Sequence, residues 1–487
     1  MIRLKITAIP RRLLCVAFAA FAAWAVAQQQ EQALRSPEDV NGFVQSAMVD
    51  VGIPGAAMTM IEGGQINLAR GFGRLDDTGN AVSAQAPFQI ASVSKSFTAL
   101  VVLQLADEAR LAIDDLVVEY LPDFRMADSA HAGAVTIRQL LNHTSGFATL
   151  DGNRLHGIGS DDPGASEKAV RQLGDSRPIA APGERFQYSN ANYIVLGHLI
   201  ETIEQKPYEQ VLDERIFSRL GMANSYAFKP LKQTAEAAKG HEQWFGIARQ
   251  NHRTPGRATL AAGGISASAE DLGKYLRALT RADPRIVPPI LARSFADAEF
   301  TGYAFGWHHA MVDGRRVIYH DGLSPGFRAL AAILPDERRA AAFVMNLSGI
   351  LGGNLHIGAV HHALGLHPVP IRPSGGIITA IWGSLATTLC FALGCFAALR
   401  KAFTLRHTPW NTAEAFRWIL VVVPSAVFAG GAYALLVLVP RSLALDFAGT
   451  GVFYPDLAAV LLATAAIGVV WAVVLPILLV KRPKAAA

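Results

Sequence analysis

Cysteine is almost absent from this chain of 487 residues, where it occurs only at positions 15, 390 and 395. All three cysteines lie in apolar runs near the ends of the chain, so residues 28–376 contain none. That stretch can form no disulfide, and it has no thiol to act as a nucleophile or a metal ligand. Its stability must therefore come from a hydrophobic core.

Several other features are missing. The chain has no dense basic tract, no phosphate-binding loop, no dinucleotide fingerprint and no internal repeat. Its net charge is +5, but the basic residues gather beside apolar segments, which indicates a membrane partner and no nucleic acid partner. Two histidine pairs, His308-His309 and His361-His362, match no common metal-site spacing, so we expect no metal and no cofactor.

Long apolar runs, in contrast, occur at both ends and give the chain a mean hydropathy of +0.27. Residues 13–27 are apolar, follow Arg11 and Arg12, and end in Ala25-Val26-Ala27. This pattern predicts a signal peptide over residues 1–27, with an uncleaved membrane anchor as the alternative.

Three further apolar runs near the C-terminus have the length of helices that cross a bilayer. They cover residues 377–399, 418–439 and 457–480. We predict a membrane domain over residues 377–487, joined to the preceding part by a Pro/Gly-rich linker, residues 367–376. Basic residues follow the first and third runs, so the positive-inside rule predicts an inner-membrane protein with residues 28–366 in the periplasm and a cytoplasmic C-terminus. Buried core helices are the alternative for these runs.

The segment Ser92-Val-Ser-Lys95 carries the chemistry that is most informative. Residues three apart are neighbours on a helix, and we predict a helix from Ser92 to about Arg110. A serine becomes a good nucleophile when an adjacent base takes its proton, and a lysine with a lowered pKa can be that base. A helix N-terminus favours both the neutral amine and an oxyanion. The alternative is that Ser92 caps the helix and that Lys95 is solvated.

A second segment contains Tyr188-Ser-Asn190. The phenol of Tyr188 can relay a proton between a serine, an amine and a leaving group. The amide of Asn190 can hold a substrate carbonyl and the lysine side chain together. The alternative is a turn that leads into an apolar helix from about Tyr193 to Ile203.

A third segment, His320-Asp321-Gly322, follows a predicted strand that ends at Tyr319. A glycine here lets a substrate backbone lie close to the strand, and the N–H of Leu323 is a candidate second oxyanion donor. The alternative is an ordinary step from a strand into a turn.

In this order and at these separations, the three segments resemble the serine β-lactamase and penicillin-binding-protein superfamily, whose Ser-x-x-Lys pair is a known signature. The Tyr-x-Asn segment matches the class C branch, which includes esterases, D-aminopeptidases and D-Ala carboxypeptidases. The resemblance runs from about Glu38 to Leu366. It implies a β-lactamase-like serine hydrolase domain over residues 28–366 and an acyl-enzyme mechanism.

The resemblance also implies roles for single residues. Ser92 is the expected nucleophile, Lys95 its base and Tyr188 the proton relay. The expected substrate-binding residues are Asn190, His320, Asp321, Gly322 and Leu323. One departure concerns the substrate, because β-lactamases of this branch carry Lys-Thr-Gly where this chain has His320-Asp321-Gly322. We therefore expect an esterase or a peptidase rather than a β-lactamase.

The expected fold class is α+β. Alternation and turn residues predict strands over 56–61 and 65–71 near the start and over 315–319, 328–334 and 340–345 near the end. Helices are expected from Glu38 to Val49 and from Asn354 to Leu364, and the middle of the chain is expected to be mostly helical. This order indicates one antiparallel sheet that is split in sequence by a helical insertion.

Two functions remain open at this point. The first is an exported, membrane-tethered serine hydrolase that acts on an ester, an amide or a peptide, with a cell-wall-derived compound among the candidate substrates. The second is a non-hydrolytic penicillin-binding or cell-wall-fragment receptor that signals through its membrane helices. The complete set of Ser92, Lys95 and Tyr188 favours the enzyme, because a binding protein does not need a proton relay.

Overall fold

The computed structural model describes residues 36–157, 160–229, 234, 236–251, 256–297, 299–349 and 353–372, scattered positions between 382 and 400, and most of 426–480. The predicted signal peptide lies outside the described residues. So do the end of the predicted linker and much of the first two predicted membrane spans.

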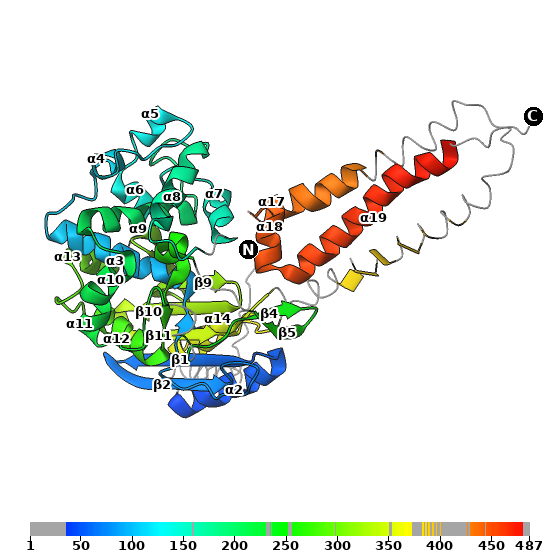
Figure 1. Ribbon diagram of the computed structural model, residues 1–487. Helices are drawn as coiled ribbons and strands as arrows, with labels where there is room; N and C mark the ends of the chain where they lie inside the picture. Colours follow the sequence, from blue (N-terminus) through cyan, green and yellow to red (C-terminus); the bar gives the residue numbers. More distant parts are fainter. Residues whose placement is uncertain are drawn as a thin grey trace, which may run out of the picture.

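A seven-stranded antiparallel sheet forms the base of the fold, in the order β2-β1-β11-β10-β9-β8-β7 (Figure 1). Its strands are β1 (Gly55–Glu62), β2 (Gln65–Gly73), β7 (Gly302–Ala304), β8 (Trp307–Val312), β9 (Arg315–Ser324), β10 (Phe327–Leu334) and β11 (Arg339–Met345). Strands from the two ends of the domain lie side by side, with Ala56 of β1 opposite Met345 of β11. The predicted split sheet is confirmed, but β7 and β8 are two strands that the sequence did not indicate.

Two helices cover one face of this sheet. Helix α2 (Pro37–Val51) is capped at its start by Ser36, whose side chain forms a capping box with Asp39, and at its end by Gly52 in the left-handed conformation. Together with α14 (Leu355–Leu364), α2 buries its apolar side chains against β1, β10 and β11. Both helices lie within two residues of their predicted positions.

The helical insertion covers the other face of the sheet (Figure 1). Its helices are α3 (Ser94–Asp107), α4 (Val117–Tyr120), α5 (Ser129–Ala132), α6 (Ile137–Leu141), α7 (Thr149–Asn153), α8 (Ala165–Gln172), α9 (Asn190–Glu204), α10 (Tyr208–Leu212), α11 (Ser218–Leu220), α12 (Ala269–Thr280) and α13 (Pro289–Ala296). The α+β fold expected from the sequence is therefore present.

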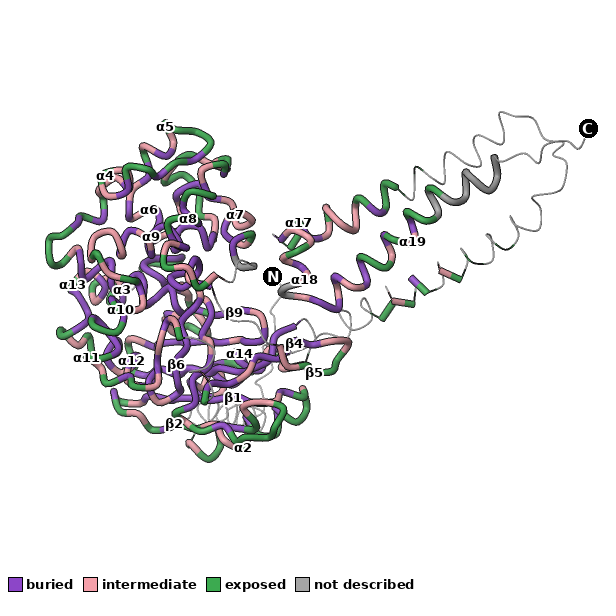
Figure 2. The backbone as a smooth tube through the Cα atoms, viewed as in Figure 1, coloured by how far each residue is buried: buried purple, intermediate pink, exposed green. Residues whose placement is uncertain are grey.

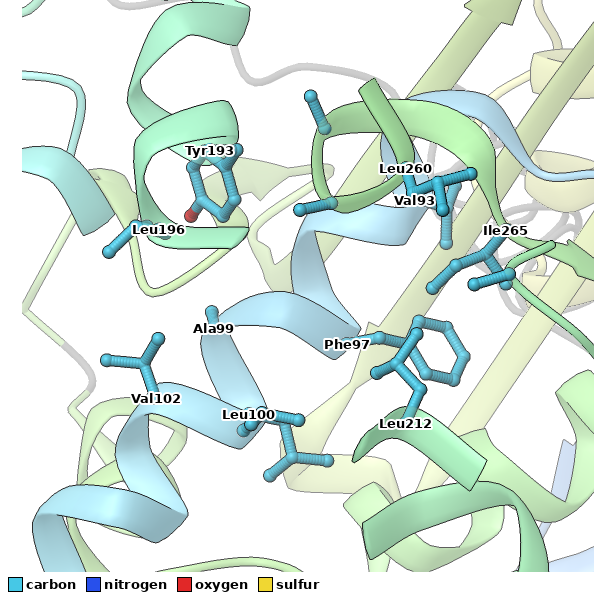
Figure 3. Close-up of a cluster of buried hydrophobic side chains, with 14 of the residues drawn as sticks. Val93, Phe97, Ala99, Leu100, Val102, Tyr193, Leu196, Leu212, Leu260 and Ile265 are labelled. Atoms are coloured by element: carbon cyan, nitrogen blue, oxygen red, sulfur yellow. The ribbon is translucent and has the colours of Figure 1, made fainter. Parts of the chain in front are cut away.

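Helix α3 is the centre of the insertion. All of its residues from Ser94 to Leu105 are buried, so the helix is enclosed on every side (Figure 2). In Figure 3, its side chains Phe97 and Leu100 lie among residues of neighbouring segments, such as Leu212 and Ile265. This packing fixes the start of α3 rigidly with respect to the surrounding elements.

Two small sheets complete the domain. Strand β3 (Phe88–Gln89), just before α3, pairs with β6 (Ser266–Ala267). The other sheet has the order β12-β4-β5, formed by Leu347–Ser348, His241–Trp244 and Ile247–Gln250.

After the domain, α17 (Val439–Ser442), α18 (Phe447–Phe453) and α19 (Pro455–Val480) form an arm that projects from it (Figure 1). The third predicted span falls on α19, whose side chains beyond Val470 lie mostly outside the described residues. Among the residues that the structure describes, no helix has both the length and the apolar character needed to cross a membrane. The three spans gain no support here and stay predictions.

Candidate active site

Ser92 lies in a short 3-10 turn, Ala91–Val93, which leads directly into α3. The helix was expected to start at Ser92, but it starts at Ser94. The difference arises at Ala91, which has a φ of 46°, a left-handed conformation that is uncommon outside glycine. Such backbone strain is found preferentially at functional sites. The turn leaves Ser92 half-buried, just before the N-terminus of the enclosed helix.

Lys95 is fully buried, which excludes the alternative of a solvated lysine. Its Nζ lies 2.7 Å from Asn190 Oδ1, 2.6 Å from the Ala262 carbonyl oxygen and 3.1 Å from Ser92 Oγ. Burial holds the pKa of Lys95 well below its usual value, and the charge of Asp321 offsets part of that decrease. A neutral amine has two hydrogens and one lone pair. The two carbonyl oxygens accept both hydrogens, so the lone pair is left for the Ser92 hydroxyl.

The Ala262 carbonyl belongs to a π-helical turn, Leu260–Gly264. Turns of this type occur frequently at functional sites. Ser94 Oγ accepts a hydrogen bond of 3.1 Å from the Ile265 N–H, which ties this turn to the start of α3. Sequence reasoning missed Ala262, because a backbone acceptor leaves no mark in the side-chain pattern.

Asn190 is the first residue of α9, which Ser189 caps through its side chain. Asn190 Nδ2 donates to Asn153 Oδ1 at 2.8 Å, which turns the amide oxygen toward Lys95. Helix α7 can place Asn153 next to Asn190 because Gly152 packs closely against α9. Any other residue at position 152 would bring its Cβ within 2.4 Å of the Ala191 nitrogen. The predicted contact of Asn190 with Lys95 is present, and its contact with a substrate stays a prediction.

The ring of Tyr188 lies beside the amine, with Lys95 Nζ 5.0 Å from the ring centroid. Its hydroxyl is buried and has no hydrogen-bond partner among the described residues. Burial raises the pKa of Tyr188. The Ser92 hydroxyl is near enough to offset part of that increase, although its geometry toward the Tyr188 hydroxyl does not meet the criteria of a hydrogen bond. The phenol is therefore neutral at ordinary pH, and its proton is available to a group that enters the site.

His143 holds the backbone on both sides of Tyr188. Its carbonyl oxygen accepts from the Gln187 N–H at 2.8 Å, and its Nδ1 accepts from the Ser189 N–H at 3.2 Å. The two rings lie 4.4 Å apart. Burial and the nearby Lys95 hold the pKa of His143 well below its usual value. Sequence reasoning did not place His143 in the site.

Strand β9 presents a free edge next to Ser92. Strand β8 pairs with β9 only as far as Tyr319, opposite His308, so the edge of residues 320–324 is not covered by β8. A Cβ at Gly322 would lie 2.5 Å from the Ile90 carbonyl oxygen, so glycine lets the serine turn approach the strand. The protein's own backbone thus requires this glycine. The roles predicted for Gly322 and Leu323 toward a substrate stay predictions.

His320 points to the helical side of β9 and is buried. Its Nδ1 donates to the Asp321 carbonyl oxygen at 2.6 Å, because a carbonyl can only accept, so Nε2 accepts from the Tyr303 hydroxyl at 3.2 Å. Burial, followed by the charge of Lys95, holds the pKa of His320 well below its usual value. A neutral imidazole thus occupies this position.

Asp321 is exposed, because successive side chains of a strand face opposite ways. It forms no ion pair with any residue that the structure describes, although its charge raises the pKa of Lys95. The charge next to the site is therefore negative. The other ionisable groups of the cluster, Lys95, His143, Tyr188 and His320, have pKa values shifted toward their neutral forms.

The structure thus places a buried lysine between a serine and a tyrosine, at the junction of the helical part and the antiparallel sheet. The family model described as Beta-lactamase matches residues 40–357. The chain belongs to this family.

Individual relatives are distant. Protein flp of Staphylococcus aureus (strain MW2) is 24% identical over 329 residues, and the match covers 64% of this chain and 64% of flp. This chain thus spans less than two thirds of the length of flp. Penicillin-binding protein 4 of Amycolatopsis lactamdurans is 28% identical over 316 residues, which cover 60% of this chain and 81% of that protein. The octameric penicillin-binding protein homologue of Pyrococcus abyssi has a TM-score of 0.60 at 25% identity, covering 69% of this chain and 79% of the other.

Proposed function

We propose that this protein is a serine hydrolase that works through an acyl-enzyme on Ser92. The observation that carries the proposal is the environment of Lys95. Burial favours its neutral form, and in that form its two hydrogens go to the carbonyl oxygens of Asn190 and Ala262 and its lone pair remains for Ser92 Oγ, 3.1 Å away. This is the state that a general base requires before the reaction starts.

The proposed reaction has two halves. Ser92 Oγ attacks the substrate carbonyl while Lys95 Nζ takes its proton, and the N–H groups of Ser92 and Leu323 stabilise the oxyanion. Tyr188 gives its proton to the leaving alcohol or amine and regains one from Lys95, which leaves the acyl group on Ser92. Water then attacks the acyl-enzyme by the reverse proton path and releases the acid.

The charges around the site support a preference among substrates. A neutral His320 stands where the β-lactamases of the class C branch carry a lysine, and the exposed carboxylate of Asp321 has no partner ion among the described residues. Asp321 faces the opposite side of β9 from His320, but its charge reaches Lys95. It would therefore repel a substrate carboxylate held at Ser92 and would favour an ester or a peptide with a free amino group. We infer that esters or amino-terminal peptides are preferred over penicillins and C-terminal D-alanyl peptides.

The test compares kcat/KM for nitrocefin, a D-alanyl-D-alanine peptide, D-alanine p-nitroanilide and p-nitrophenyl butyrate. Either of the last two is expected to be the best substrate, and Asp321→Thr is expected to shift the ratio toward the first two. A clear lead for nitrocefin or for the D-alanyl-D-alanine peptide in the wild type would contradict the preference.

We also propose that the domain is exported and tethered to the inner membrane. The basic and apolar pattern of residues 1–27 and the basic residues that follow the first and third C-terminal runs support this location.

A further inference from the structure

A groove with a volume of about 800 Å³ lies beside the site, and the reaction as proposed does not use it. The groove is lined by the start of α6, the loop before Tyr188, the segment that leads into β7, and parts of β7, β8 and β9. Phe186 and Phe300 line it with 47% and 36% of their surfaces exposed. Large aromatic side chains left open to solvent in a concave surface are typical of a binding site.

Tyr303 belongs both to the lining of the groove and to the site. It lines the groove, and its hydroxyl donates to His320 Nε2 at 3.2 Å. Its ring centroid lies 6.1 Å from that of Tyr188 and 5.9 Å from that of Phe186. The groove therefore adjoins Tyr188 through the ring of Tyr303, which is the residue that the groove and the site have in common.

The position of the groove indicates which part of a substrate would enter it. The uncovered edge of β9 begins at His320 and runs away from the groove to Ser324, where a second cavity of about 280 Å³ is lined by Gln89 and Phe327. The groove lies at the opposite end, next to Tyr188, the proposed proton donor to the leaving group. The two halves of a substrate would thus extend in opposite directions from Ser92.

The walls of the groove carry almost no net charge at neutral pH. Burial lowers the pKa of His308, and it lowers the pKa of His309 to about 4, so both rings are uncharged. The one strong cation among the described lining residues, Arg138, donates to both oxygens of Asp114, at 2.6 and 2.8 Å. Aromatic faces with a balanced ion pair at the rim suit an uncharged apolar ligand.

We propose that this groove binds an uncharged aromatic group on the leaving-group side of the substrate. The proposal rests on the proposed function, and it deepens that function by naming the class of leaving group: the alcohol or amine that departs carries a ring, which lies between Phe186 and Phe300.

The test uses three esters that place a ring on different sides of the bond that is cleaved. Benzyl acetate carries the ring on the alcohol, ethyl phenylacetate carries it on the acyl group, and ethyl acetate carries none. Full-length wild type, Phe186→Ala and Phe300→Ala are compared by acid release. Met311→Ala is the control, because Met311 is an apolar residue of β8 that is 53% exposed and does not line the groove.

Phe186→Ala and Phe300→Ala are each expected to lower kcat/KM for benzyl acetate about fivefold and to change it for the other two esters by less than about twofold. Met311→Ala is expected to leave all three unchanged. An equal loss on all three esters, a loss limited to ethyl phenylacetate, or no loss in either variant would overturn the proposal. Failure of the proposed function is a separate result, in which Ser92→Ala hydrolyses benzyl acetate as fast as wild type does.

Discussion

Lys95 Nζ lies 3.1 Å from Ser92 Oγ, and the other two hydrogen-bond partners of the amine are oxygens that can only accept. In its neutral form, which burial favours, the amine cannot give a hydrogen to Ser92 without losing one of its bonds to Asn190 or Ala262, whereas it can take one from Ser92 at no such cost.

The first prediction concerns pH. Lys95 acts as a base only in its neutral form, so activity is expected to rise with pH through the pKa of Lys95 and then to level off. Because burial lowers that pKa, the plateau should be reached well below pH about 10, the usual value for a lysine. Asp321 raises this pKa, so Asp321→Asn is expected to move the rising limb to lower pH.

The measurement is kcat/KM for p-nitrophenyl acetate across the pH range. Asp213→Asn is the control, because Asp213 is an exposed carboxylate on another element and is not among the charges that shift the Lys95 pKa. If kcat/KM of the wild type rises only near pH about 10, or if Asp321→Asn moves that rise to higher pH, the assignment of Lys95 as the base is contradicted.

The second prediction separates a catalytic hydroxyl from a structural one. The Tyr188 hydroxyl has no hydrogen-bond partner among the described residues, so Tyr188→Phe should cost at least about tenfold in kcat and almost nothing in stability. The Tyr193 hydroxyl donates to the Leu141 carbonyl at 2.9 Å. Tyr193→Phe should therefore cost about 1 kcal/mol or more in the free energy of unfolding, with a smaller effect on kcat.

Both quantities can be measured on each variant, by steady-state kinetics and by chemical denaturation. If Tyr188→Phe turns over substrate as fast as wild type, Tyr188 has no part in proton transfer.

The third prediction concerns the contact between β9 and the serine turn. A methyl group at Gly322 would lie 2.5 Å from the Ile90 carbonyl oxygen, so Gly322→Ala must displace the turn that carries Ser92. We expect a loss of about 10²-fold in acylation, since displacing a reacting group by about 1 Å costs that much. Gly42 of α2 has open space around it, and Gly42→Ala should raise the free energy of unfolding by about 0.5–1 kcal/mol.

The acylation rate of these two variants is measured with a chromogenic ester under single-turnover conditions. Wild-type acylation in Gly322→Ala would show that the strand and the turn do not need this close contact.

The fourth prediction concerns topology. Alkaline phosphatase is active only outside the cytoplasm, so a fusion after Gly375 should be active and a fusion after Ala487 inactive. The reverse pattern would contradict both the export of the domain and the cytoplasmic position of the C-terminus.

Much of the fold could be predicted from the sequence, because its strands and helices carry strong local patterns. Helix α2 begins at Pro37 after the capping Ser36, and apolar residues fill most of α3. Strands β7 and β8 were missed, because β7 has only three residues and β8 interrupts its apolar alternation with two adjacent histidines. The turn between them depends on Phe305, whose φ of 51° is not indicated by its residue type.

The candidate site was predictable where side chains form the motif, and Lys95 does lie within hydrogen-bonding distance of both Ser92 and Asn190. The parts that were missed depend on the backbone. The Ala262 carbonyl is supplied by a π-helical turn, and His143 is aligned by a left-handed φ of 57°. Tertiary packing creates both features, and the local sequence does not specify them.

The most direct test of the account is to identify the residue that reacts with a serine-directed phosphonate. Full-length protein is labelled with a fluorescent phosphonate, digested, and analysed by mass spectrometry. The account predicts one modified site at Ser92, no labelling in Ser92→Ala, and full labelling in the control Ser83→Ala, where an exposed serine is removed. Full labelling of Ser92→Ala, or a modification mapped to another serine, would contradict it.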